Sequence, residues 1–240
     1  MDILKNTIAI AWKETRAYYS TPTAYIVGAM FLVLTGIFFV FDITRPFAEA
    51  SIRGLVTWAS LFLVFLAPLL TMRLLAEEQK LGTLELLLTS PVRDWEVVLG
   101  KYIASLITLS VTLLFMLYYV ILLWAYGEPD WGPLWSAYLG LFLFGAAALA
   151  IGLMASSFSS NQIVAAVVGI GLMLVLSFMD RVGDLMQGVS AEVIAGISMN
   201  SHFSDFARGV LDTSHIIYYF SVIAVFLFIT VRSLETRRWR

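Results

Sequence analysis

Apolar residues run through this chain in long stretches that charged residues interrupt at intervals. A helix needs roughly 20 mostly apolar residues to cross the hydrocarbon core of a bilayer, with some latitude for tilt. Six stretches meet that requirement, at residues 23–41, 55–75, 97–125, 134–156, 163–179 and 216–231. Residues 139–155 lack the alternation of a barrel strand, and a lone strand leaves backbone groups unpaired in lipid. The pattern predicts an all-α polytopic membrane protein with six transmembrane helices in a single domain, residues 1–240.

Two further segments have helical periodicity without spanning length. Residues 1–22 predict a helix lying in the membrane interface, which Pro22 separates from the first span. Its apolar residues are Leu4, Ile8, Ala11, Trp12 and Tyr19, and its basic residues Lys5, Lys13 and Arg16 take the other side. Segment 180–215 is too long for a plain connector, and its apolar spacing predicts two short helices on the outer membrane face.

Composition supports the membrane prediction and excludes several classes of site. Hydrophobic residues make up 60% of the chain and charged residues 13%, whereas a soluble domain carries about 25% charged residues. Without cysteine, the chain forms no disulfide and no thiolate metal site, and two histidines are too few for a multi-histidine metal centre. The net charge of −2 gives no field that attracts nucleic acid.

The placement of Lys and Arg predicts the orientation. Six spans put both termini on one side, together with the loops at 76–96 and 157–162. That side carries Lys5, Lys13, Arg16, Arg73, Lys80, Arg93, Lys101, Arg232, Arg237, Arg238 and Arg240. The other side carries Arg45, Arg53, Arg181 and Arg208. We therefore expect a multi-pass protein of the plasma (inner) membrane with both termini cytoplasmic.

The 76–96 loop has the most informative local pattern. Gly82 permits a turn, and Thr83 is a suitable cap for a short leucine-rich helix that Pro91 ends. Asp94 and Glu96 then suit the N-terminus of the third span. A leucine-rich helix outside the membrane either docks on a partner or packs beneath the bundle.

The stretch Glu77-Glu78-Gln-Lys-Leu-Gly82-Thr83-Leu-Glu85-Leu-Leu-Leu-Thr-Ser-Pro91-Val92, followed by Gly100-Lys101, resembles the signature loop of ABC-2 type exporter permeases. The likeness extends to the N-terminal helix, the six spans, the basic C-terminal end and Phe203-x-x-Phe206-x-Arg208-Gly209 before the last span. The chain is most similar to the short permeases of gliding-motility and nitrous-oxide-reductase-maturation systems.

The resemblance implies a permease subunit whose coupling helix docks on a separate ABC ATPase subunit, working beside a second permease copy or a similar permease. It also leaves room for an accessory extracytoplasmic protein. Carried over by position, the ATPase-coupling residues are Glu77, Glu78, Gly82, Thr83, Glu85, Leu86, Leu87, Pro91 and Val92. Trp12, Lys13 and Arg16 belong to the interfacial helix. The chain has no G-x-x-x-x-G-K-[ST] phosphate loop. We therefore expect ATP and magnesium in the partner, and neither catalytic residue nor cofactor in this chain.

Two other classes remain open. A secondary transporter usually buries an ionisable residue in a span. With Lys101 assigned to the charges outside the membrane, the third to fifth spans offer none.

An intramembrane serine protease is the enzyme alternative, with Ser190 in Gly188-Val-Ser190-Ala191 as nucleophile and His202 or His215 as base. Small residues of the fourth span, including Ala148, Gly152 and Ser156, favour intramolecular helix packing over a dimer interface.

Overall fold

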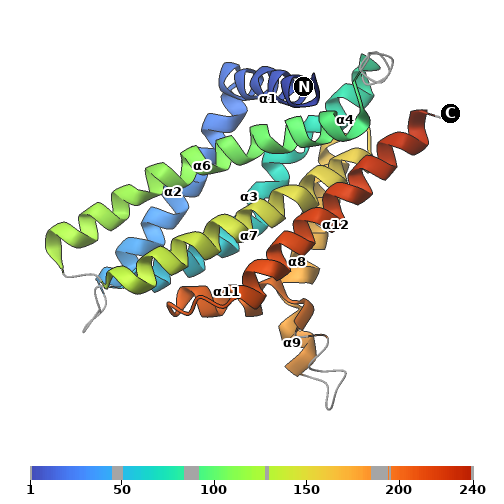
Figure 1. Cartoon of the computed structure of the whole chain (residues 1–240). Coiled ribbons are helices and arrows are strands. Elements are labelled where there is room, and N and C mark those ends of the chain that lie inside the picture. The colour runs from blue at the N-terminus through green and yellow to red at the C-terminus, as the bar shows by residue number, and fades with distance from the viewer. Residues whose placement is uncertain are drawn as a thin grey trace.

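The computed structural model describes residues 2–44, 51–83, 92–127, 130–184, 194 and 196–238. Every regular element in these residues is a helix (Figure 1). The helices are α1 (Asp2–Ser20), α2 (Pro22–Ile43), α3 (Arg53–Thr71), α4 (Arg73–Leu81), α6 (Asp94–Tyr126), α7 (Trp131–Phe158), α8 (Gln162–Ser177), α9 (Met179–Asp184), α11 (Met199–Ala207) and α12 (Thr213–Arg238). The prediction of an all-α polytopic membrane protein is confirmed.

The predicted spans coincide with helices, with two differences. Within the described residues, five helices are long and apolar enough to cross a membrane, and one of these combines α3 and α4 as Arg53–Leu81. Residues 76–81, which the sequence places in a loop, therefore continue a helix. The fifth predicted span is α8, whose 16 residues rise only about 24 Å against a core of about 30 Å.

Helix α7 forms the centre of the bundle. In its most apolar stretch 89% of the residues are buried, and it packs against α3, α6, α8, α11 and α12. Glycines allow this closeness, because a Cβ on Gly152 would lie 3.0 Å from the Pro68 Cα, and one on Gly145 would lie 2.7 Å from Leu109 Cδ2. The prediction that small residues of this span serve packing within the chain is confirmed.

Helices α2 and α12 line the outside of the bundle. Only 17% and 11% of their apolar windows are buried. Large apolar side chains such as Phe41 and Phe228 are exposed there. Such faces suit contact with lipid tails, which are as apolar as the side chains themselves.

The short elements collect at two opposite ends of the bundle (Figure 1). Helices α1 and α4 lie with the last turns of α12 at one end, which we call the α1 end, and α9 and α11 lie at the other, the α11 end. Helix α1 packs across the start of α6, and its position in the membrane interface stays a prediction. Helix α11 lies in the stretch where the second short helix is expected, whereas most of the first, residues 185–193, lies outside the described part of the chain.

The packing of α7 on α3 gives a first prediction. Gly152→Ala should lower the free energy of unfolding by about 1–3 kcal/mol, because the added methyl group meets the Pro68 backbone and the Thr71 side chain. Denaturant titration of the purified protein in micelles measures this change. Gly171→Ala is the matched control, since its Cβ would have open space. Equal effects of both variants would contradict this account of the packing.

Candidate functional site

A buried lysine joins three helices at the α1 end. Lys101, in α6, is 0% exposed. Its Nζ lies 3.0 Å from Glu14 Oε1 of α1 and 2.8 Å from Glu78 Oε1 of α4. A buried charge is costly unless it is paired and hydrogen-bonded. The Lys101 triad, meaning Glu14, Glu78 and Lys101, therefore holds α1, α4 and α6 in one arrangement.

The residue before the lysine explains how α1 comes so close. A Cβ on Gly100 would lie 2.7 Å from Ile10 Cγ2 and 3.1 Å from the Thr7 carbonyl oxygen. Only glycine therefore allows this contact without a shift of α1. The Gly100-Lys101 pair thus supplies both the close approach and the charge that ties α1 to α6.

A second carboxylate joins α1 to the first turn of α6. Glu96 Oε2 accepts a hydrogen bond from the Arg93 backbone N–H at 2.8 Å and one from Asn6 Nδ2 at 3.4 Å. The first of these is half of a capping box, which satisfies N–H groups that the helix start leaves free. Helix α6 begins at Asp94, as the acidic residues predict.

Serines of α7 hold the junction between α3 and α4. Ser156 Oγ donates to the Met72 carbonyl at 2.8 Å and accepts from the N–H groups of Leu75 and Ala76 at 3.1 and 3.0 Å. Pro68 lies one turn before Met72 in α3, and it has no backbone N–H to donate to the helix. In α4, Gln79 Nε2 donates to the Ser157 carbonyl at 2.9 Å. Helix α4 is thereby fixed to α7 as well as to α6.

Arg73, the first residue of α4, connects this helix to the junction of α1 and α2. Its Nη1 donates to Thr21 Oγ1 at 2.7 Å and to Thr23 Oγ1 at 3.1 Å, and its guanidinium lies 4.7 Å above the Tyr18 ring. The Tyr18 hydroxyl donates to the Leu70 carbonyl at 2.8 Å. Burial raises the pKa of the Tyr18 phenol, so this group stays a neutral donor.

The structure separates the residues that the sequence groups as coupling residues. Glu78 belongs to the Lys101 triad, whereas the side chain of Glu77 is exposed. Gly82 ends α4 in the left-handed conformation with φ 69°, the usual role of a glycine at a helix C-terminus. The Thr83 hydroxyl bonds back to the Glu78 carbonyl at 3.4 Å. Val92 is half-buried before α6, and Glu85, Leu86, Leu87 and Pro91 lie outside the described residues.

The three residues assigned to the interfacial helix face away from α6. Trp12 is 58% exposed, and the Arg16 guanidinium lies 5.0 Å above its ring. Lys13 is exposed, with its Nζ 3.9 Å from Glu14 Oε1. These residues form a face of α1 that is both apolar and basic.

Sequence reasoning missed the centre of this site. It assigns Lys101 to the charges outside the membrane and takes the third span as uncharged, but the lysine is enclosed among three helices. A local signal exists: a glycine followed by a lysine, about two turns after the acidic helix start at Asp94, marks a place where another helix approaches closely. Glu14 carries no such mark, because its partner is 87 residues away in the chain.

The two histidines lie together at the α11 end. Their Nδ1 atoms are 2.7 Å apart, His215 Nε2 lies 2.9 Å from Asp205 Oδ2, and His202 Nε2 lies 3.0 Å from the Gly196 carbonyl. Burial lowers the pKa of His202. The described residues include no group of three or more acidic or histidine side chains placed to hold a metal ion. Ser190, the candidate nucleophile, lies outside them.

These observations define a polytopic all-α membrane protein in which the N-terminal helix α1 and a helix continuing the second span are tied to the third span by buried charge. The family model of ABC-2 family transporter proteins matches residues 8–237, so the chain belongs to that family. The resemblance noted from the 77–92 stretch is confirmed at family level.

Relatives among known proteins match over a shorter stretch. The probable multidrug ABC transporter permease YbhR of Escherichia coli strain K12 is 34% identical over 87 residues. Its counterpart in Escherichia coli O157:H7 gives the same values. The match covers 36% of this chain and 23% of the relative's length. The finer likeness to motility and nitrous-oxide-reductase-maturation permeases stays a prediction.

The Lys101 triad gives a second prediction. Lys101→Met should lower the free energy of unfolding by about 3–5 kcal/mol, because Glu14 and Glu78 lose the buried counter-charge that they share. Unfolding in mixed micelles measures this change. Replacing all three residues, as Glu14→Gln, Glu78→Gln and Lys101→Met, should recover most of the loss. Lys13→Met, which removes an exposed lysine nearby, is the control and should change stability by less than about 0.5 kcal/mol.

Proposed function

We propose that this chain is the permease subunit of an ATP-driven ABC exporter, in which a separate ATPase subunit binds and hydrolyses ATP with magnesium. The observation that carries the proposal is the Lys101 triad, because it connects the helix leading into the 82–92 segment to two other elements of the membrane domain. The chain itself has no catalytic role in this assignment. Two permeases and two ATPase subunits make the working transporter.

The anchoring of α4 supports a mechanical link to the bundle. Coupling between distant sites needs packed elements with specific contacts between them. Helix α4 has such contacts with α6 through Glu78, with α7 through Gln79 and with the α1–α2 junction through Arg73. A force on the segment after Gly82 would therefore reach three parts of the bundle at once.

The distribution of basic residues supports a cytoplasmic position for the α1 end. Arg73, Lys80 and Arg93 flank the proposed coupling segment, and basic residues concentrate on the cytoplasmic side of membrane proteins. This orientation places α4 and the 82–92 segment where an ATPase can reach them. We accordingly place the protein in the inner membrane with both termini in the cytoplasm.

A hydrophobic small molecule is the cargo we favour, because the relative is named as a probable multidrug permease. The chain's likeness to that protein covers only part of each, so mechanical work without transport is the second candidate. A serine protease gains no support from the histidines. Their four ring nitrogens already have partners in each other, Asp205 and the Gly196 carbonyl.

Glu78→Gln tests the coupling role in the reconstituted permease–ATPase complex. This change keeps the side chain's shape and removes its charge from the triad. We expect substrate efflux per ATP hydrolysed to fall roughly tenfold, since a hydrogen bond to a charged group contributes about 1.5–3 kcal/mol. Efflux and ATP hydrolysis are measured on the same proteoliposomes.

Two controls complete this experiment. Glu235→Gln removes a carboxylate of the same end that pairs with Arg232 on the exposed side of α12, and it should leave coupling unchanged. The purified chain alone should not hydrolyse ATP. Robust hydrolysis by the chain alone, or unchanged coupling in an assembled Glu78→Gln complex, would contradict the proposal.

A further inference from the structure

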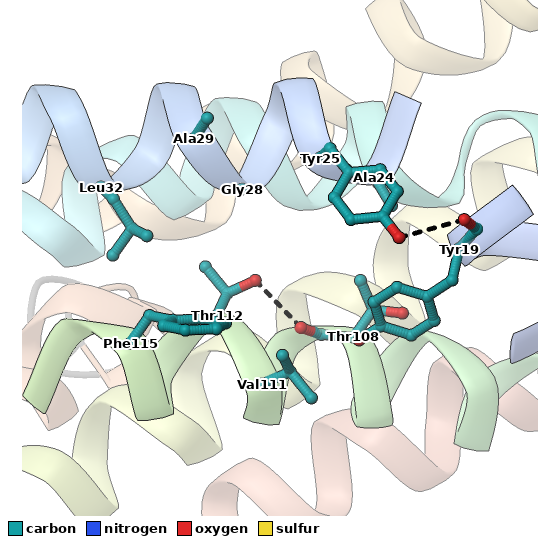
Figure 2. A pocket seen from close by; sticks show the side chains of 10 residues that line it. All are labelled: Tyr19, Ala24, Tyr25, Gly28, Ala29, Leu32, Thr108, Val111, Thr112 and Phe115. Atoms are coloured by element: carbon teal, nitrogen blue, oxygen red, sulfur yellow. Dashed lines mark hydrogen bonds between the residues drawn. The ribbon is translucent and has the colours of Figure 1, made fainter. Parts of the chain in front are cut away.

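A cavity lies between the first half of α2 and the middle of α6. Its volume is about 260 Å³, and its walls come from both helices and from Tyr19 at the end of α1. Figure 2 shows Gly28 and Leu32 of α2 facing Thr112 and Phe115 of α6 across this space. We call this cavity the α2–α6 groove.

The groove lies at the depth of the membrane leaflet next to the α1 end. Its α2 residues run from Ala24 to Leu32, a rise of about 12 Å from near the start of the span. Half of a hydrocarbon core is about 15 Å. At the mouth, the Tyr25 hydroxyl donates to the Tyr19 carbonyl at 3.1 Å, and tyrosines are typical of the membrane interface.

The walls of the groove are suited to hydrocarbon. The hydroxyls of Thr108 and Thr112 donate to carbonyls of their own helix, at 3.0 and 2.9 Å. These groups therefore need no polar ligand. The rest of the lining is largely aliphatic and aromatic, and Gly28 leaves the α2 wall without a side chain.

The exposed surface of α1, the helix whose end lines the mouth through Tyr19, is suited to the anionic surface of a leaflet. Leu4, Ile8 and Trp12 are 71%, 58% and 58% exposed, at a spacing of four residues. Successive residues of a helix are rotated by about 100° around its axis. This rotation places Lys5, Lys13 and Arg16 next to the apolar stripe, on the side of α1 opposite the buried residues Ala11 and Tyr18. Arg16 lies one turn before Tyr19. Apolar and basic faces side by side are typical of helices that bind anionic lipid surfaces.

We propose that the α2–α6 groove binds one acyl chain of an anionic phospholipid from the adjacent leaflet, with its phosphate beside Arg16 and Lys13. The lipid contacts α1, α2 and α6 from outside the bundle, whereas the Lys101 triad joins α1 to α6 from inside. The site does not depend on ATP or on a partner subunit.

Spin-labelled lipids test this site on the purified chain in phosphatidylcholine vesicles. The fraction of motionally restricted label is measured for phosphatidylglycerol and for phosphatidylcholine carrying the same acyl chain. We expect the chain to prefer phosphatidylglycerol roughly fivefold or more, the preference that one basic residue near an anionic head group gives. Arg16→Gln should reduce this preference severalfold, while Arg208→Gln, at the α11 end, should leave it unchanged.

Filling the groove is the second arm. Gly28→Leu should abolish the preference for phosphatidylglycerol over phosphatidylcholine, because its side chain fills the groove. Gly28→Ala should only weaken that preference, because its Cβ fits at 3.5 Å from Thr112 Oγ1 and takes up little of the space. Gly171→Leu, where a Cβ meets open space in α8, is the matched control and should have no effect. Thermal unfolding confirms that each variant is folded.

Several outcomes would overturn the proposal. Equal binding of the two lipids would exclude an anionic site, and equal effects of Gly28→Leu and Gly171→Leu would indicate non-specific lipid contact. The chain has no cysteine, so Gly28→Cys gives a single reactive thiol. Efficient disulfide cross-linking of two such chains in vesicles would show that a second copy covers the groove.

Discussion

The arrangement of the α1 end depends on a cation that has no access to water. Lys101 projects from a membrane-spanning helix and is fully buried, so its charge is tolerated only while carboxylates of α1 and α4 stay in contact with it. A hydrophobic contact in the same place would let α1 slide along α6, because apolar side chains in a membrane gain little by choosing one apolar neighbour over another. The ion pairs instead specify one register for three helices.

Close packing around α7 provides the rigid frame for this junction. Its small residues let α3 approach, and Ser156 then satisfies backbone groups on both sides of the α3–α4 junction. In the membrane, a polar group is stable only where such partners exist. The polar contacts of α4 thus lie next to the break between α3 and α4 at Met72. They fix the direction of α4 at the α1 end.

The sequence predicts the helices better than it predicts the site. Long apolar stretches define the spans because hydrocarbon excludes charge. The helical spacing of apolar residues near the N-terminus defines α1. The sequence does not indicate the limits of α4, since Glu77, Glu78 and Lys80 are typical of loops although a helix at the end of a span carries them equally well. It places Lys101 outside the membrane, because an isolated lysine near the end of a span usually extends to water. Its partners come from helices distant in the sequence, and no local pattern encodes that pairing.

Helix α1 has two faces with opposite requirements. The face against α6 is specified by Gly100 and Lys101, while the other face presents exposed apolar and basic side chains. The first face fixes the helix to α6 and the second suits the membrane surface, so α1 can contact the protein and the lipid at the same time. A tilt of α6 would carry Glu14 with it and move Trp12 and Arg16 relative to the lipid. The proposed lipid in the α2–α6 groove would contact α1, α2 and α6 together, so it would resist a tilt that narrows the space between α2 and α6. Helix α1 would then respond both to the lipid at its exposed face and to α4 through the Lys101 triad.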